Sequence, residues 1–393
     1  MSAAIETSSD ADAHPLASTV LSNRCVVCVG PGGVGKTSTA AALGMYAAAA
    51  GKRTVVLTID PAKRLANALG LSEIGSVERP VSAAAFEQAG LPPPKGQLSA
   101  MMLDIKQAWD EVIRRYHPDE EKREKLLNNR LYQAMSTALA GSQEYMAMEK
   151  LHALSTRSED PLDVIILDTP PANHALDFLE APSRIVNALD NDATRWLVEP
   201  YQNQGRLSRR LFDAGSTFFI RTISKFIGTE MLEDLAELLV GFQGMFEGFQ
   251  ARAATVSGLL SAEDTVFVVV TAPSAVGVAD AEAFVSRLEA REHRVGAVIL
   301  NRTTPDPWRT STPPAPEAFR AALEAQGGDT DLAHRLYSAA LADRAQAASE
   351  AEGARALQAQ YPTVAVVSVP ELVEDVHDLK GLSRLRDALA MDG

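Results

Sequence analysis

The chain has 393 residues, of which 46% are hydrophobic, and a formal net charge of -14. This length and composition predict a globular protein with a substantial core, built as one large α/β domain with insertions or as two modest domains. The excess of acidic side chains argues against a nucleic-acid partner, because phosphate backbones are bound by clustered Lys and Arg.

The first segment, residues 1–22, is rich in Ser, Ala and Asp. It lacks the basic start and the continuous apolar core of a secretory signal, and no later run approaches the roughly 20 apolar residues of a membrane span. We therefore expect a disordered tail, a folded domain over residues 23–393 and a cytoplasmic location.

Six short apolar runs, rich in β-branched residues, predict strands that are buried on both faces. Turn residues and a helical pattern follow each run, which predicts an α/β fold with a doubly wound, mostly parallel sheet and a ligand site at the carboxyl ends of the strands. The runs are residues 25–29, 54–59, 164–167, 266–270, 295–300 and 364–367.

The only two cysteines, Cys25 and Cys28, fall in the first of these strands. Their C-x-x-C spacing is typical of redox pairs and zinc sites, but residues three apart in a strand point to opposite faces and lie about 10 Å apart. Since no further thiol is available to complete a metal site, the sequence favours packing in the core.

The segment after the first strand, GPGGVGKT at residues 30–37, satisfies G-x-x-x-x-G-K-[ST] and opens an Ala-rich helix. Such a P-loop turns backbone N–H groups toward the phosphates of ATP, while Lys36 reaches the β and γ phosphates and Thr37 ligates Mg²⁺. The predicted nucleotide-binding residues are Gly30, Gly32, Gly33, Val34, Gly35, Lys36, Thr37 and Ser38.

Acidic residues end the next two strands in the chain. Asp60, followed by Pro61, is placed to orient or deprotonate an attacking water, a role compatible with capping a helix. Asp168 ends an apolar run in the manner of a Walker B element, which predicts a place in the Mg²⁺ shell. His174 follows six residues later, either as a switch residue or as a capping or packing histidine.

Two intervals, about 83–159 and 181–262, carry no strand pattern and predict helical insertions. The second contains an apolar stripe at helical spacing, formed by Met231, Leu235, Leu238, Phe242, Met245 and Phe249. Either this stripe packs against a similar helix over residues 212–227, or it lines a groove for an apolar client.

Near the C-terminus, Asn301 follows the fifth strand, where its amide is placed to read the edge of a base. Residues 303–316 are Pro-rich and predict a surface loop, and residues 317–360 predict helix. Pro370 follows the last strand in a turn placed to close over adenine.

These segments together resemble the ArsA and guided-entry-of-tail-anchored-proteins ATPase family, a branch of the deviant Walker A P-loop NTPases. GPGGVGKTS resembles its P-loop, TIDPAKRLANALG its switch I, GSQEYMAMEKL the loop after its first helical region, DTPPANHALDFL its switch II, and ILNR with SVPEL its adenine-binding segments. The resemblance implies a dimer that opens and closes with ATP and Mg²⁺, in which Asp60 positions the hydrolytic water and Asp168 lies in the Mg²⁺ shell.

Two features of that family are missing. Its P-loop carries a lysine after the first glycine that reaches the partner's phosphates, and Pro31 stands there in this chain. We expect either a related subunit to supply the charge or Lys63 or Arg64 to replace it, so both a homodimer and a heterodimer are open. The zinc C-x-x-C that bridges the family's dimer is also absent.

The resemblance implies an ATP-binding and hydrolysing switch that couples dimer closure to the handling of a hydrophobic client, such as a tail-anchored membrane protein. An arsenite or anion pump subunit is an alternative, but it needs soft thiolates that the chain lacks outside its first strand. A regulatory subunit that binds nucleotide with little turnover is the other alternative, since Pro31 supplies no charge.

Overall fold

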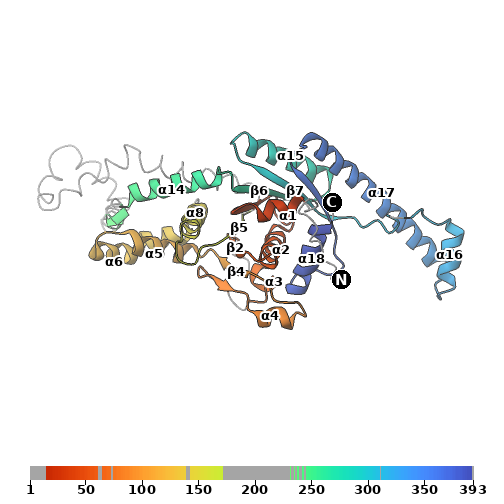
Figure 1. The fold of residues 1–393 in the computed structure, drawn as a ribbon, viewed down its shortest axis with the longest axis horizontal. Helices are drawn as coiled ribbons and strands as arrows, with labels where there is room; N and C mark the ends of the chain where they lie inside the picture. Colours follow the sequence, from red (N-terminus) through yellow and green to blue (C-terminus); the bar gives the residue numbers. More distant parts are fainter. Residues whose placement is uncertain are drawn as a thin grey trace, which may run out of the picture.

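The computed structural model describes residues 15–60, 64–71, 74–138, 142–170, 231, 234, 237–238, 241–242, 245–309 and 311–391. An eight-stranded sheet lies at its centre, in the order β3-β4-β2-β5-β1-β6-β7-β8 (Figure 1). Neighbouring strands run parallel, except for β3 against β4. The strands are β1 (Cys25–Val29), β2 (Arg53–Thr58), β3 (Arg79–Pro80), β4 (Gln97–Met102), β5 (Val164–Asp168), β6 (Thr265–Thr271), β7 (Val295–Thr303) and β8 (Ala365–Pro370).

Helices cover both faces of this sheet, and two groups of them extend beyond it. In chain order they are α1 (Pro15–Leu21), α2 (Lys36–Ala49), α3 (Arg64–Ala68), α4 (Ala83–Gln88), α5 (Ile105–Tyr116), α6 (Glu120–Asn128), α7 (Arg130–Ala138), α8 (Ser142–Ser155), α14 (Phe246–Leu260), α15 (Ala275–Glu289), α16 (Pro316–Glu324), α17 (Thr330–Gln360) and α18 (Leu379–Met391). The predicted doubly wound, mostly parallel sheet is thereby confirmed. No helix in the described ranges is both long and apolar enough to cross a membrane.

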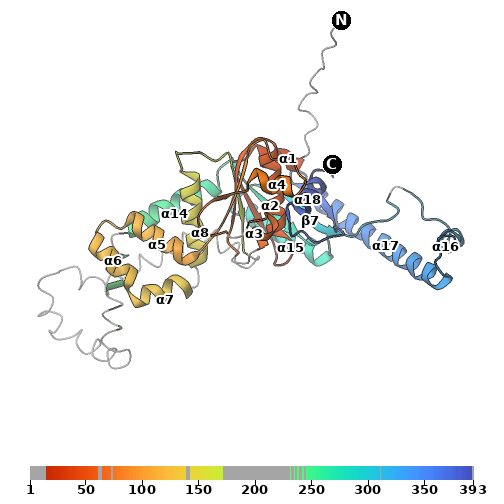
Figure 2. The ribbon, with the colours of Figure 1, turned by 90° about the horizontal axis from the view of Figure 1, so that it is seen from below.

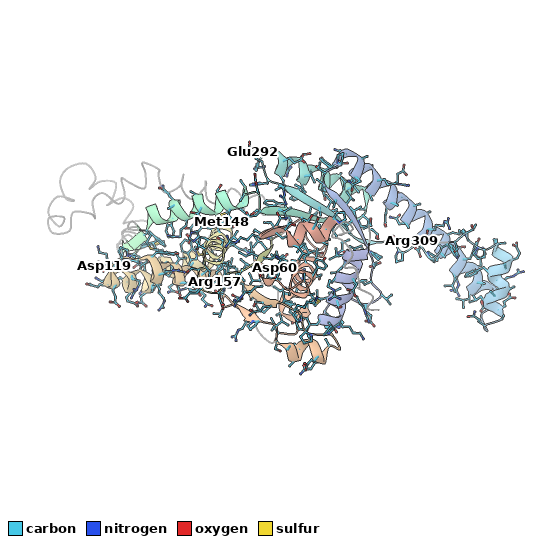
Figure 3. The ribbon with its side chains drawn as sticks, in the orientation of Figure 1. Asp60, Asp119, Met148, Arg157, Glu292 and Arg309 are labelled. Atoms are coloured by element: carbon cyan, nitrogen blue, oxygen red, sulfur yellow. The ribbon has the colours of Figure 1, made fainter. Side chains whose placement is uncertain are left out.

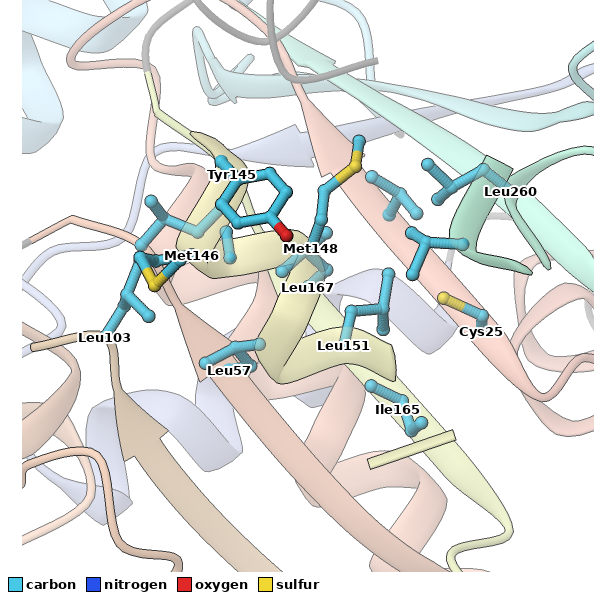
Figure 4. Packing of buried hydrophobic residues seen from close by; sticks show 14 of the residues in the cluster. Cys25, Leu57, Leu103, Tyr145, Met146, Met148, Leu151, Ile165, Leu167 and Leu260 are labelled. Carbon is cyan, nitrogen blue, oxygen red and sulfur yellow. The ribbon is translucent and has the colours of Figure 1, made fainter. Parts of the chain in front are cut away.

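The two cysteines show how the sheet divides the core. Cys25 packs on the face that carries α8 and α14, in one cluster with Leu151 and Leu260 (Figure 4). Cys28 packs on the opposite face, in the cluster that includes α2 and α18. Both are fully buried free thiols, and burial raises the pKa of Cys25 to about 12. The prediction that they pack in the core rather than pair is confirmed.

The interval 83–159 was expected to lack strands, and that expectation is wrong. Strand β4 lies within it and pairs in parallel with β2 from Arg53↔Gln97 to Thr58↔Met102. Its sequence, QLSAMM, contains no β-branched or aromatic residue, so intrinsic propensity gives no signal for a strand. Pairing with β2 and burial of Leu98 and Ala100 decide its conformation.

Among the described residues, helices α5, α6, α7, α8 and α14 form a helical lobe at one end of the sheet (Figures 1 and 2). Aromatic side chains fill its centre. The ring centroid of Trp109 lies 5.8 Å from Tyr145, 5.7 Å from Phe242 and 6.3 Å from Phe249. A buried ion pair joins α8 to α14, with Arg252 Nε donating to Glu149 Oε2 at 2.6 Å.

The predicted apolar stripe therefore lies largely inside this lobe. Its members Leu238, Phe242, Met245 and Phe249 are buried in the cluster that α5 and α8 share, while Met231 is 47% exposed. In its described part the stripe meets α5 and α8 rather than an open groove. Leu235 and the partner segment 212–227 lie outside the described residues.

The predicted helical segment 317–360 is confirmed as α16 and α17, with a break between them. These helices form an arm that projects from the opposite end of the sheet. In Figure 3, Arg309 lies between the sheet and this arm, and Asp119 lies at the far end of the helical lobe. The Glu350 carboxylate, buried where α17 meets the sheet, accepts the Thr304 backbone N–H at 2.7 Å and its hydroxyl at 3.0 Å. The arm is thus anchored beside the end of β7.

Candidate functional site

The loop between β1 and α2 requires glycine at two of its positions. A Cβ on Gly30 would lie 2.0 Å from the Val270 carbonyl oxygen, and a Cβ on Gly35 would lie 2.3 Å from Asn301 Nδ2. Both glycines, together with Gly33, have positive φ angles, a conformation that side chains with a Cβ rarely adopt. The backbone can take this tight path only because these side chains are absent.

Helix α2 presents its N-terminus to this loop. Its first ladder bond runs from Thr39 N to Gly35 O at 2.9 Å, so the N–H groups of residues 36–38 precede any intrahelical partner. Gly35 occupies the N-cap position and has no side chain to accept from them. The positive end of the helix is therefore open to an anion, as expected for the predicted binding residues Thr37 and Ser38.

Lys36 places its ammonium group inside the loop. Its Nζ donates to the carbonyl oxygens of Gly30 at 3.0 Å and Pro31 at 2.7 Å, and the residue is 7% exposed. Burial lowers the pKa of Lys36, and the nearby Asp168 carboxylate opposes that shift. The loop therefore carries a side-chain cation in addition to its backbone donors, while Gly32 and Gly33 are exposed on its outer side.

Asp168 is the last residue of β5, lies beside the P-loop residue Thr37 and is only 1% exposed. Its Oδ2 accepts the Thr37 hydroxyl at 2.7 Å and the Thr58 hydroxyl at 2.8 Å. Its Oδ1 is buried and has no hydrogen-bond partner among the described residues. Burial raises the pKa of Asp168 to about 6, partly offset by the two threonine hydroxyls.

The oxygens of Thr37 and Asp168 fit a magnesium ion. Mg²⁺ prefers hard oxygen ligands and is commonly held by one or two carboxylates together with substrate phosphates. The unpartnered Asp168 Oδ1 and the Thr37 hydroxyl are such ligands, and the structure brings them together although the residues are 131 positions apart in the chain.

Asp60 follows β2 and lies in the central part of the molecule, where Figure 3 labels it. Its backbone N–H donates to the Thr58 hydroxyl at 3.2 Å, and its side chain is half-buried. Its charge acts on both Lys36 and Asp168, raising the pKa of each. The structure thus gathers Lys36, Asp60 and Asp168 at the carboxyl ends of β1, β2 and β5.

The two predicted adenine-side residues lie at the carboxyl ends of β7 and β8. Asn301 is 8% exposed, and its Nδ2 donates to the Val34 carbonyl of the P-loop at 2.7 Å. A bulge follows it, where Arg302 has a φ of 62°, and the Cα of Thr303 pairs with the exposed Pro370. The amide nitrogen of Asn301 is therefore engaged by the loop itself, and its role in reading a base stays a prediction.

Three predicted residues, Pro61, Lys63 and His174, lie outside the described residues. Arg64, the first residue of α3, is exposed, and its charge lowers the pKa of Lys36. It therefore lies close enough to the P-loop for its charge to act there.

Two residues of the site were missed by sequence reasoning. Thr58 connects Asp60 with Asp168, and the Gln143 Nε2 of α8 donates to the Ile59 carbonyl at 2.7 Å. Thr58 stands two positions before Asp60 at the end of its strand. A search for hydroxyl side chains at the strand ends that face Asp168 could therefore have found it. Gln143 lies in the segment GSQEYMAMEKL that carries the family resemblance, but the sequence gave no signal for its contact with Ile59, because 84 residues separate the two.

Comparison with known proteins gives matches along most of the chain. A family model described as anion-transporting ATPase matches residues 23–326. ATPase ASNA1 homolog 1 of Paramecium tetraurelia is 26% identical over 228 residues, which cover 56% of this chain and 63% of that protein. ATPase get3 of Pyrenophora tritici-repentis is 24% identical over 302 residues, covering 75% and 78%.

The arsenical pump-driving ATPase of Acidiphilium multivorum is 30% identical over 160 residues, which cover 39% of this chain and 24% of that protein. The match thus spans less than two thirds of the Paramecium protein and about a quarter of the Acidiphilium protein.

Proposed function

Because the chain belongs to the anion-transporting ATPase family, with residues 23–326 matching its model, we propose that it binds ATP with Mg²⁺ and hydrolyses it. The observation that carries the proposal is the convergence of Lys36, Thr37 and Asp168 around the loop after β1. Backbone donors and an ammonium group suit the phosphates, and the paired oxygens suit the metal.

Each of the gathered residues has a distinct role in the proposed hydrolysis of ATP. The N–H groups at the start of α2 and Lys36 would bind the phosphates, and Thr37 and Asp168 would hold a Mg²⁺ ion, which when bound would supply positive charge against the phosphate oxygens. Asp60, at the end of β2, orients the attacking water. Positioning and charge stabilisation are the main contributions that phosphoryl transfer requires of a protein.

The charge that Pro31 cannot supply has a candidate source in Arg64. Its influence on the pKa of Lys36 supports a position near the loop, and its side chain is exposed. We propose that Arg64 supplies the missing cation within this chain, or that a related subunit supplies it across a dimer interface.

We further propose that nucleotide-dependent closure of a dimer acts on a hydrophobic client through the helical lobe. The bond from Gln143 to Ile59 supports this coupling, because it joins α8 of the lobe to the strand end that carries Asp60. The buried part of the apolar stripe cannot itself bind a client without unpacking the lobe. The client surface is therefore expected among other residues, with the exposed Met231 at its border.

The arsenite alternative is not favoured by the structure. One relative is named an arsenical pump-driving ATPase, but here both thiols are fully buried on opposite faces of the sheet. The part of the chain that the structure describes contains no group of three or more His, Cys, Asp or Glu residues that could hold a metal. A soft metalloid therefore has no thiolate site in these residues.

The first experiment measures ATP binding by calorimetry in the presence of Mg²⁺, together with release of phosphate. Lys36→Met removes the ammonium group and keeps much of the buried volume, whereas Lys52→Met changes a lysine at the amino end of β2. We expect binding and turnover in the wild type and the Lys52 variant, and loss of turnover with weaker binding in the Lys36 variant. Absence of any ATP uptake by the wild type would overturn the proposal, and uptake without turnover would indicate either a regulatory subunit or a chain that needs a related subunit to supply the missing cation.

The second experiment tests the source of the missing cation. Arg64→Ala is expected to reduce turnover by at least tenfold, since charges of the arginine-finger type are worth about 10³ to 10⁵ in rate. Arg320→Ala, on the distant arm, is the matched control and should leave turnover unchanged. Full turnover of the Arg64 variant as a purified single chain would exclude Arg64 from this role.

A further inference from the structure

Thr58 occupies a position between the two acidic residues of the site. It is the last residue of β2, it is 1% exposed, and its Cα pairs with that of Asp168 on the neighbouring β5. Its hydroxyl donates to Asp168 Oδ2 at 2.8 Å and accepts the backbone N–H of Asp60 at 3.2 Å. One buried hydroxyl therefore contacts both Asp168, whose carboxylate is suited to bind a metal, and Asp60, which is proposed to orient the attacking water.

The geometry at Asp168 shows what this hydroxyl does. Two donors, from Thr37 and Thr58, converge on Oδ2, which fixes the rotation of the carboxylate and leaves Oδ1 without a partner. Since a hydroxyl carries one hydrogen, its donation to Asp168 turns the lone pairs of Thr58 toward the Asp60 N–H. The direction of each hydrogen bond thus determines the other.

The backbone around Thr58 is held from both sides. Ile59 N donates to the Asp168 carbonyl at 3.1 Å, and the Ile59 carbonyl accepts from Gln143 at 2.7 Å. A displacement of the Asp168 side chain is therefore passed to Asp60 chiefly through the Thr58 hydroxyl, because the adjacent peptide is already fixed.

We propose that Thr58 is a positioning residue that aims Asp168 Oδ1 at the metal and keeps Asp60 in register with it. The inference rests on the proposed function, since it assigns a role at the same Mg²⁺–nucleotide site. Thr58 does not touch the reacting groups itself. It acts through two residues that do.

Three variants separate this role from simple packing. Thr58→Val removes the hydroxyl and keeps the shape, and Thr58→Ser keeps the hydroxyl. Thr54→Val is the matched control, because Thr54 lies four residues earlier on the same strand and face, is fully buried, and has only a 3.5 Å contact to the Lys52 carbonyl. Circular dichroism verifies that each variant is folded.

The readout is the affinity for ADP by calorimetry, measured with Mg²⁺ and with EDTA, because the ratio of the two isolates the metal's contribution from binding of the nucleotide. A hydrogen bond to a charged group contributes enough that its loss should reduce this ratio by about tenfold or more in Thr58→Val. Thr58→Ser should stay within about threefold of the wild type, and Thr54→Val should be unchanged. At saturating ATP and Mg²⁺, kcat should also fall in Thr58→Val, since Asp60 is displaced, and KM should rise with the loss of the metal's contribution to nucleotide affinity.

A Thr58→Val protein that keeps the wild-type Mg²⁺ ratio, or a Thr58→Ser protein that loses it equally, overturns the proposal. A failure of the proposed function looks different, because the wild type itself would then bind no ADP under either condition. Wild-type binding with an unchanged Thr58→Val ratio leaves the ATPase proposal standing and removes only the role of Thr58.

Discussion

Replacing Asp168 with Asn should stabilise the ligand-free protein at neutral pH. Burial raises the pKa of this carboxyl from 3.8 to about 6, so the folded protein holds an ionised group that the unfolded chain would hold at lower cost. Because the folded pKa is raised, the folded state binds more protons than the unfolded state between pH 3.8 and about 6, and stability falls as pH rises through that window. The difference corresponds to about 3 kcal/mol above pH 7.

Asn has nearly the shape of Asp and cannot ionise, and its side-chain oxygen can still accept from the two threonine hydroxyls. The free energy of unfolding in urea, measured with EDTA and without nucleotide, should rise at pH 7.5 in Asp168→Asn by at most about 3 kcal/mol, because the amide N–H groups replace the unpartnered Oδ1 without gaining an acceptor. At pH 5 the gain should shrink to roughly half, since the carboxyl of the folded wild type is then mostly protonated and no longer carries the buried charge.

The matched control is Asp119→Asn, which changes an exposed helix N-cap whose pKa is lowered by the backbone N–H of Lys122. Asn is a comparable N-cap, so no stabilisation is expected at either pH. An Asp168→Asn protein whose stability changes between pH 5 and pH 7.5 as much as that of the wild type would show that the carboxylate is not held at a cost, and the reasoning about its raised pKa would fail. Added Mg²⁺ should stabilise the wild type more than the variant.

Three further outcomes follow from the described contacts. Arg252→Met leaves its buried carboxylate partner unpaired and should lower the free energy of unfolding in urea by about 3 kcal/mol or more, whereas Lys125→Met, which breaks an exposed pair, should change it little. Gly35→Ala should weaken ATP binding in calorimetry and lower the melting temperature, because its φ of 95° and the 2.3 Å approach of a side-chain nitrogen exclude a Cβ; a fully active variant would contradict that geometry. Cys25 and Cys28 should resist a thiol reagent in the native state and both react in urea, because burial raises the pKa of each thiol; rapid native labelling would place one of them at the surface.

Much of the fold could be predicted from the sequence, because its strongest signals are local. Apolar runs rich in β-branched residues marked six strands, and the opposite orientation of Cys25 and Cys28 followed from the two-residue period of a strand. The strand β4 could not be predicted, since QLSAMM has no intrinsic preference that distinguishes it from helix, and pairing with β2 decided its conformation.

The candidate site divides in the same way. Gly30 to Ser38, Asp60 and Asp168 carry local motifs, so the sequence alone determined which residues were candidates and that they lie at strand ends. The sequence could not show that the hydroxyls of Thr37 and Thr58 both donate to one oxygen of Asp168. Nor could it show that the Asn301 amide, expected to read a base, donates to the P-loop.

What the sequence by itself determined about this protein is therefore its phosphate-binding loop, its parallel sheet and its family resemblance. Only the tertiary structure decided that the apolar stripe from Leu238 to Phe249 lies inside the helical lobe and that Gln143 reaches the strand end before Asp60. The physical reason is that motifs and periodicity depend on neighbours in the chain, whereas burial and side-chain hydrogen bonds depend on segments about 100 residues apart that folding alone brings into contact.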